Sequence, residues 1–428
     1  MYVLFNDEEE KSKWSSNQGV QTHYDPQENL LAILLRWSGT VTPLVVYKQM
    51  FWLLLSFHFG LLVLNEHYYN LPAMDLSILL GLPASLLIFL VVFYNGNCYE
   101  RFFELWRHTC EINAIVNQWI IQVAFTMEEI DARDDGVIDG KGTFKNGLLD
   151  VDEATWNAAR RILSAMQMLF MSLDCSISDE DRDWIGRPVR LPNIMLGDGL
   201  DDEEYKILKR QGLLTDTEIR YIKQYPGFKC QVPIKWALLE LREACMPNNR
   251  MNNESKNYEA MQEIATSFNT TAITMVTLMQ QPVPFMYFHI LKLMMLIVNG
   301  LIAYEMVNIF ADISWSLSLF TYAIIAATMI GLLEIAGAMS DPFGTDPTDF
   351  DTHTVCFDAY KNAVAYLAAR PPSGLGADKP TKNPIKDLHA AELRASAAAA
   401  ATQLRHLPEP VGLPPPQAAY GLEQAMGV

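Results

Sequence analysis

Four long hydrophobic segments constrain this chain more than any other feature of its sequence. They cover approximately residues 43–64, 76–94, 283–310 and 315–339. Each is close to the ~20 residues that a helix needs to cross ~30 Å of hydrocarbon. The sequence therefore predicts a multi-pass integral membrane protein with four transmembrane helices.

The hydrophobic segments include the ionisable side chains of Lys48, His58, Lys292, Glu305 and Glu334. Because charge is costly in lipid, we expect these side chains to face neighbouring helices, to reach the interface or to line a wet cavity. Lys48 lies near the end of its segment, so we expect its long side chain to snorkel to the interface.

The distribution of Lys and Arg predicts the orientation in the membrane. The short links 65–75 and 311–314 contain neither residue, whereas the N-terminus, the large polar block between the second and third segments, and the tail contain all those outside the membrane. By the positive-inside rule, both termini and the polar block lie on the cytosolic side, or on the stromal side of an organelle. We expect the plasma membrane or an organelle membrane such as the thylakoid.

The polar block carries the periodicity of helices and no signature of an enzyme. Helical spacing of apolar residues covers 100–129, 153–173 and 254–278, without an alternating strand pattern. Glycine-rich phosphate loops, a hydrolase nucleophile elbow and a zinc-protease motif are missing. We therefore expect an all-α protein that is not an enzyme, in preference to a membrane-tethered catalyst. The net charge of −18 argues against nucleic acid as a partner.

An acidic turn follows the fourth hydrophobic segment directly. Residues 341–351 read DPFGTDPTDFD, with carboxylates three positions apart across a Pro/Gly turn. Such carboxylates can converge with backbone carbonyls on one hard cation, and calcium suits an oxygen shell of this kind. The alternative is a solvated acidic turn that binds no metal.

Several motifs, in matching order and spacing, carry a family resemblance. Residues 36–40 read RWSGT, 93–104 read FYNGNCYERFFE, 211–215 read QGLLT, 282–284 read PVP, and 341–350 form the acidic turn. Together they resemble the bestrophins, a family of pentameric, mostly calcium-regulated anion channels. The similarity extends roughly from residue 23 to residue 365, and we expect a eukaryotic type such as an algal one.

The resemblance implies that the second membrane helix lines a narrow hydrophobic neck, with Ser85, Phe89 and Phe93 at its constriction. These residues are spaced at i, i+4 and i+8, which places them on one stripe of a helix. Five copies would form three stacked rings, and rings of Phe can close a pore by dewetting and present positive ring edges to an anion. The alternative is an ordinary aromatic packing stripe. Ser85 replaces the bulky aliphatic residue usual in the family, which should widen that end of the neck.

The resemblance also makes the acidic turn a calcium clasp. It assigns carboxylates from Asp346 and Asp349 and backbone carbonyls from Ala338 and Asp341 as ligands, completed by a carbonyl near His23 on the N-terminal segment. A site that joins the N-terminal arm to the fourth helix could convert calcium binding into opening of the neck, provided that calcium binds the open state better.

A second constriction, at the cytosolic mouth, falls near Lys256 by counting back from Pro284. A ring of lysines would attract anions directly. A slip of one or two residues would place Ser255, Asn257 or Asn253 there, and the remaining alternative is a solvated lysine.

We therefore expect an all-α homopentamer around a central pore, with four transmembrane helices and a large helical cytosolic region per subunit. It would be a calcium-activated channel for chloride and bicarbonate; the alternative is a non-conducting membrane scaffold or regulatory subunit. The predicted regions are an N-terminal arm (1–42), helices one and two with the neck (43–94), a helical cytosolic region (95–282), helices three and four (283–340), the clasp turn with a following helix (341–368), and a Pro/Ala-rich tail (369–428).

Overall fold

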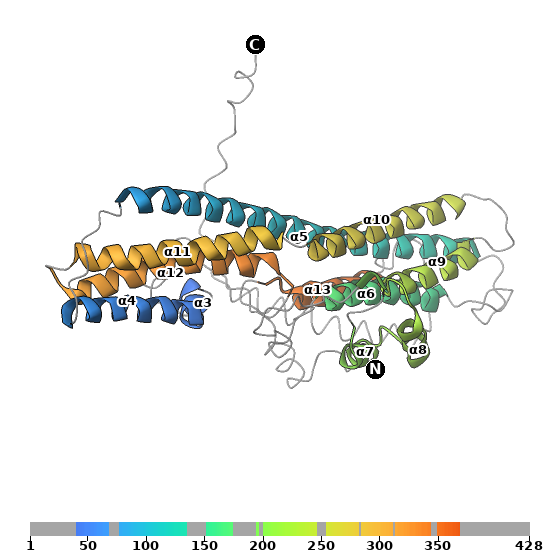
Figure 1. Cartoon of the computed structure of the whole chain (residues 1–428). Coiled ribbons are helices and arrows are strands. Elements are labelled where there is room, and N and C mark those ends of the chain that lie inside the picture. Colours follow the sequence, from blue (N-terminus) through green and yellow to red (C-terminus); the bar gives the residue numbers. More distant parts are fainter. Residues whose placement is uncertain are drawn as a thin grey trace, which may run out of the picture. The chain divides into compact units, whose positions relative to one another are not determined.

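The computed structural model of the chain describes residues 40–67, 77–134, 151–173, 194–196, 200–245, 254–281, 284–310, 313–343 and 349–368. Every regular element within these ranges is a helix, which confirms the all-α prediction (Figure 1). The chain divides into two compact units, Met1–Ala363 and Val364–Val428.

Within the described ranges, four helices are long and apolar enough to cross a membrane, as predicted from hydropathy. They are α4 (Gln49–His67), the first part of α5 (Ser77–Asp134), α11 (Phe285–Ile309) and α12 (Trp315–Ser340). Their shared core is apolar and includes several alanines, among them Ala303, Ala326 and Ala336. Small residues of this kind let membrane helices approach closely.

The first predicted segment is interrupted, which its hydrophobicity did not predict. Residues Val41–Val46 form a separate short helix, α3, and α4 begins only at Gln49. At the break, the Lys48 amide donates to the Val45 carbonyl at 3.1 Å, a tight turn that ends the first helix. Helix α3 then packs against α12, where a Cβ atom added to Gly331 would lie only 2.7 Å from Cγ2 of Val41.

Helix α5 continues without interruption from the membrane helices into the polar part of the protein. Its 58 residues correspond to a length of roughly 85 Å. Beyond the membrane helices it packs against α6 (Val151–Leu173) and α10 (Glu254–Gln280). Leu105, Ile112 and Trp119, spaced seven apart, are completely buried, and the Trp119 indole donates to the Ala158 carbonyl of α6 at 3.1 Å. The spacing explains why one face of the helix stays in the core.

Shorter helices complete the polar part: α7 (Asp202–Arg210), α8 (Asp216–Gln224), α9 (Gln231–Cys245) and α13 (Thr352–Ala368), with a 3-10 turn at Ile194–Leu196. Asp201 and Thr215 close capping boxes at the starts of α7 and α8. Such caps satisfy the first backbone amides of a helix, which explains why these short helices begin where they do.

The turn between α7 and α8 is fixed by a buried ion pair. The Arg160 guanidinium of α6 donates to both carboxylate oxygens of Glu218 at 3.0 Å and to the Leu213 carbonyl at 2.9 Å. Burial opposes ionisation of Glu218, but the hydrogen bonds and charge of Arg160, together with the hydrogen bonds from Thr215, outweigh it, so the pKa of Glu218 lies below its usual value.

We expect the substitution Gly212→Ala to destabilise this turn by about 1 kcal/mol, because Gly212 has a φ of 71°, in the left-handed region that disfavours a Cβ atom. No atom lies within 4 Å of the added Cβ, so the cost is backbone strain alone. Thermal unfolding of the purified protein measures the loss. Gly212→Asn is the matched control, because Asn tolerates this region better. Equal losses in the two variants would contradict the strain argument.

Candidate functional site

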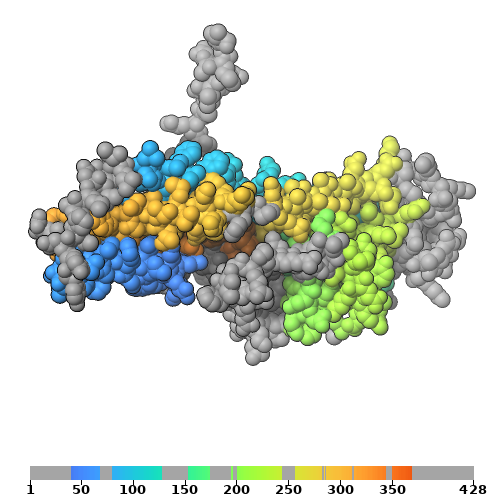
Figure 2. Space-filling view, in the orientation of Figure 1, coloured from blue at the N-terminus to red at the C-terminus, as the bar shows by residue number. Residues whose placement is uncertain are grey.

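The residues predicted to form the neck lie together on an exposed strip of α5. Phe89 and Phe93 expose 65% and 54% of their surface, and Ser85 is also exposed. The opposite face of the same helix is buried against α11 and α12, through residues such as Leu87 and Val91. Figure 2 shows part of α5, in blue and cyan, at the surface along the upper edge of the membrane helices.

The exposed strip continues beyond the three predicted residues. Helical spacing adds Leu82 and Val92 in the membrane part, and Tyr99 and Phe103 farther along, all of them exposed. The rings of Tyr99 and Phe103 contact each other at 5.4 Å. A large, exposed apolar strip of this kind requires lipid, another subunit or a dewetted pore to cover it.

Two side chains of the strip have contacts that the sequence did not predict. The Ser85 hydroxyl donates to the Gly81 carbonyl at 2.7 Å, so its proton is used within the helix. The rings of Phe93 and Tyr287 form a T-shaped pair with 6.3 Å between centroids, and the Tyr287 hydroxyl donates to the Leu90 carbonyl at 2.9 Å. Phe93 is therefore linked to the beginning of α11.

Arg101 connects α5 to the segment that leads into α11. Its guanidinium donates to the carbonyl oxygens of Met279 and Gln281, both at 3.0 Å. These carbonyls lie at the end of α10, where a cation is favourable because the last carbonyls of a helix lack partners within it. Sequence reasoning used Arg101 only as part of a motif and gave it no role.

The predicted calcium ligands are only partly within the described residues; His23 and Asp346 lie outside them. Ala338 lies in the last turn of α12, Asp341 directly follows that helix, and Asp349 is 2% exposed. The Phe350 amide donates to the Pro342 carbonyl at 2.9 Å, which closes the acidic turn into a loop. Carboxylate and carbonyl oxygens at a closed loop are a donor set that calcium accepts. Among the residues that the structure describes, no group of three or more His, Cys, Asp or Glu side chains could hold a metal.

Two phenylalanines anchor the acidic turn to the helices of the polar part. Phe350 contacts the rings of Phe102 and Trp106 of α5, at 4.8 and 5.0 Å between centroids. Phe343 contacts Phe350 at 5.4 Å and stacks on Phe170 of α6 at 6.3 Å. The turn is thus packed on the same helix that carries Phe89, about 20 Å away along its axis.

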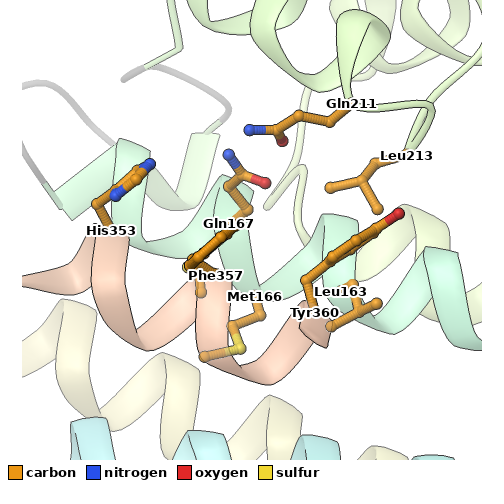
Figure 3. A pocket seen from close by; sticks show the side chains of 9 residues that line it. Leu163, Met166, Gln167, Gln211, Leu213, His353, Phe357 and Tyr360 are labelled. Carbon is orange, nitrogen blue, oxygen red and sulfur yellow. The ribbon is translucent and has the colours of Figure 1, made fainter. Parts of the chain in front are cut away.

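Helix α13 continues the turn and closes a small cavity against α6. Its first turn is capped by Asp351, whose carboxylate accepts hydrogen bonds from the Thr354 amide at 2.9 Å and hydroxyl at 2.6 Å. Figure 3 shows three side chains of α13 facing α6 and the turn between α7 and α8. The lining residues are Leu163, Met166, Gln167, Gln211, Leu213, His353, Cys356, Phe357 and Tyr360.

The cavity offers no charge to a ligand. Burial lowers the pKa of His353, and the carboxylate of Asp351 opposes this shift only in part. Burial also raises the pKa of the Cys356 thiol. Both side chains are therefore neutral at physiological pH. The cavity is better explained by the packing of α13 on α6 than by a binding site for an ion.

Lys256, the predicted cytosolic constriction, is exposed in the first turn of α10. It lies roughly 36 Å along the helix axis from Gln280, at the other end of α10. The structure brings it to none of the predicted site residues that lie within the described ranges. A ring at Lys256 would therefore be separate from the neck.

His58 of α4 faces neighbouring helices, as expected for a polar side chain in a membrane helix. Its Nδ1 lies 3.0 Å from the Ala303 carbonyl oxygen, and its Nε2 lies 3.2 Å from the Ser318 hydroxyl. Lys48, for which we expected snorkelling, pairs through its ammonium group with Glu334 at 2.8 Å, and its side chain is 46% exposed. The break between α3 and α4 accompanies this pairing, since Lys48 lies in it.

Comparisons with known proteins agree with the fold. A family model described as Bacterial/Fungal Bestrophin protein matches residues 22–364. A mutant of a bacterial Bestrophin homolog from Klebsiella pneumoniae has a TM-score of 0.54 and 15% identity, covering 75% of this chain and 98% of its own. A second mutant of that homolog has a TM-score of 0.55 and 14% identity, with coverages of 78% and 100%. No curated protein matches the chain.

Proposed function

Because the chain belongs to the Bacterial/Fungal Bestrophin family, we propose that it is a membrane anion channel assembled from several copies around a central pore. The observation that carries this proposal is the exposed strip of α5 with Ser85, Phe89 and Phe93. In a homopentamer, the five copies of the strip would face one another across the axis. This would cover an apolar surface that a single subunit leaves bare.

The chemistry of the strip suits a gated path for small monovalent anions such as chloride and bicarbonate. Rings of Phe89 and Phe93 would exclude water when the helices are close, which closes the pore without a plug. When the helices separate, the positive edges of the aromatic rings can favour an anion. The negative net charge of the chain does not prevent this, because a permeating ion responds to the local potential along the pore.

We further propose that calcium at the acidic turn regulates the neck. Asp346 and Asp349 would supply carboxylates, with backbone oxygens of Ala338 and Asp341 and one near His23. Support comes from the packing of Phe350 on Phe102 and Trp106 of α5. If calcium binds more tightly when the α5 helices are separated and the neck is open, it would shift the population of channels toward this open state.

The experiment that tests channel activity is the reversal potential across a planar bilayer that contains the purified protein in a chloride gradient. A value near the chloride equilibrium potential supports an anion channel. A value near the cation equilibrium potential would contradict the proposed anion selectivity. A bilayer that carries no current would favour the alternative of a non-conducting scaffold.

We expect Ser85→Ile to lower the single-channel conductance severalfold, because a bulky aliphatic ring would narrow and dry one end of the neck. Ser85 is exposed, so the substitution disturbs no packing within the subunit. Ser85→Ala is the matched control for size, because it removes the hydroxyl without adding bulk. Unchanged conductance in Ser85→Ile would show that this residue does not line the constriction.

A further inference from the structure

Two lysines and one glutamate meet where α3 joins α4, away from the strip on α5. The Lys48 ammonium lies 2.8 Å from Oε2 of Glu334, and the Lys292 ammonium lies 3.2 Å from Oε1 of the same carboxylate. Three separate elements contribute: the break before α4, α11 and α12. One carboxylate thus serves two cations, and the cluster carries a net formal charge of +1.

The two lysine side chains are more exposed to solvent than the carboxylate with which they pair. The side chains of Lys48 and Lys292 are 46% and 36% exposed, whereas that of Glu334 is 16% exposed. The cluster lines an open pocket whose other lining residues are Tyr47, Gln49, Met50, Met295 and Ile330. A ligand that enters this pocket therefore meets ammonium groups first, with apolar side chains beside them.

The depth of the cluster matches the boundary between hydrocarbon and headgroups. Lys292 follows the start of α11 at Phe285, and Glu334 precedes the end of α12 at Ser340, each by about 10 Å along its helix. The 26 residues of α12 correspond to about 39 Å, which exceeds the ~30 Å of hydrocarbon. Several ångströms of the helix thus extend beyond the hydrocarbon, and lysine side chains bridge the remaining depth.

The pocket opens on the side of the membrane that faces the polar part of the protein and away from the exposed strip of α5. In Figure 1, α3 and α4 lie on one side of α11 and α12, and α5 lies on the other side. This agrees with the packing of α3 on α12 and of α4 on both helices. Tyr47 at its rim is 76% exposed. By the Lys and Arg distribution, this is the non-translocated leaflet.

We propose that this pocket binds the phosphate group of an anionic phospholipid of that leaflet, between Lys48 and Lys292. An uncompensated positive charge is costly at this depth, and a single phosphodiester would neutralise it. Both ammonium groups can donate charge-assisted hydrogen bonds to its oxygens, with Glu334 behind them. Tyr47, which is 76% exposed, and the partly exposed Met50 would contact the beginning of the acyl chains, whereas Met295 and Ile330 lie buried beneath them. The inference rests on the membrane fold and is independent of ion conduction.

Native mass spectrometry of the purified full-length protein with equal amounts of phosphatidylglycerol and phosphatidylcholine tests the proposal. The parent protein should retain phosphatidylglycerol in preference to phosphatidylcholine. Lys48→Gln and Lys292→Gln should each reduce this preference severalfold, whereas Glu334→Gln should increase it, because two cations then lack a counter-charge. Lys235→Gln, at an exposed lysine of α9, is the matched control and should change nothing.

The lysine and glutamate substitutions are expected to change the phosphatidylglycerol preference in opposite directions. This distinguishes a lipid site from a structural ion pair. A merely structural role predicts lower stability in all three variants without a change in the lipid ratio, and that result would overturn the proposal. If a lysine variant fails to fold, the lipid preference of Glu334→Gln still decides between the two roles: an increase supports the lipid site, and no change or a decrease overturns it. Inorganic phosphate added at millimolar concentration should not displace the lipid. If phosphate binds as tightly as phosphatidylglycerol and displaces it, free phosphate is the ligand and the assignment to lipid is overturned.

Discussion

Replacing Phe89 with alanine is expected to produce anion flux in the absence of calcium, about tenfold above that of the parent protein, because a ring of five large side chains no longer dries the neck. Phe89 is 65% exposed, so the change removes little packing within the subunit. Flux from liposomes that contain the purified variant, with calcium chelated, measures the effect.

Ile88→Ala is the matched control for this substitution. Ile88 neighbours Phe89 in the chain and is also exposed, but it lies off the strip by about 100° around the helix. The control variant should therefore retain the calcium dependence of the parent. If Phe89→Ala needs calcium as the parent does, Phe89 is not part of the gate.

The double substitution Asp346→Asn and Asp349→Asn is expected to abolish stimulation of flux by micromolar calcium. Asparagine keeps the size of the side chain but removes the charge that a hard cation requires, so the apparent affinity should fall by about tenfold or more. A calcium titration of flux measures the change. Adding Phe89→Ala to this variant should restore flux without calcium, since the neck would be open whatever the clasp binds.

Asp351→Asn is the control within the same turn. Asp351 caps α13 through Thr354, and asparagine is an equally favoured cap, so this variant should keep both its stability and its response to calcium. Full stimulation by calcium in the double Asp346 and Asp349 variant would contradict the clasp, and the acidic turn would then be a solvated connection.

The membrane helices could be predicted from hydropathy, but their limits could not. Asn95, Gly96 and Asn97 favour the end of a helix by intrinsic propensity, yet α5 continues through them. Buried residues on either side, Tyr94 and Cys98, hold this stretch in the core and override the local preference. Helix α3 is likewise separate from α4 and packs against α12, and no local pattern in the sequence reveals this break.

Within the candidate site, the resemblance to bestrophins selected Ser85, Phe89 and Phe93, and their helical spacing predicted one stripe. The structure places all three on one exposed strip. The link from the acidic turn to α5 was missed. Its signal was present, because aromatic residues flank the acidic turn at Phe343 and Phe350, but their partners belong to distant helices.

The pairing of Lys48 and Lys292 with Glu334 was also beyond sequence reasoning. Each residue was recognised as a charge in a hydrophobic segment, and the cost of such charges predicted that they would find partners. Which partner each one finds depends on how three helices pack, and hydropathy carries no information about that packing.

Chloride flux through the purified protein in liposomes, with and without micromolar calcium, tests the central claim most directly. The claim predicts passive chloride flux that calcium increases. Absence of flux under both conditions, from protein shown to be correctly assembled, would contradict the claim and leave a non-conducting membrane scaffold of this fold.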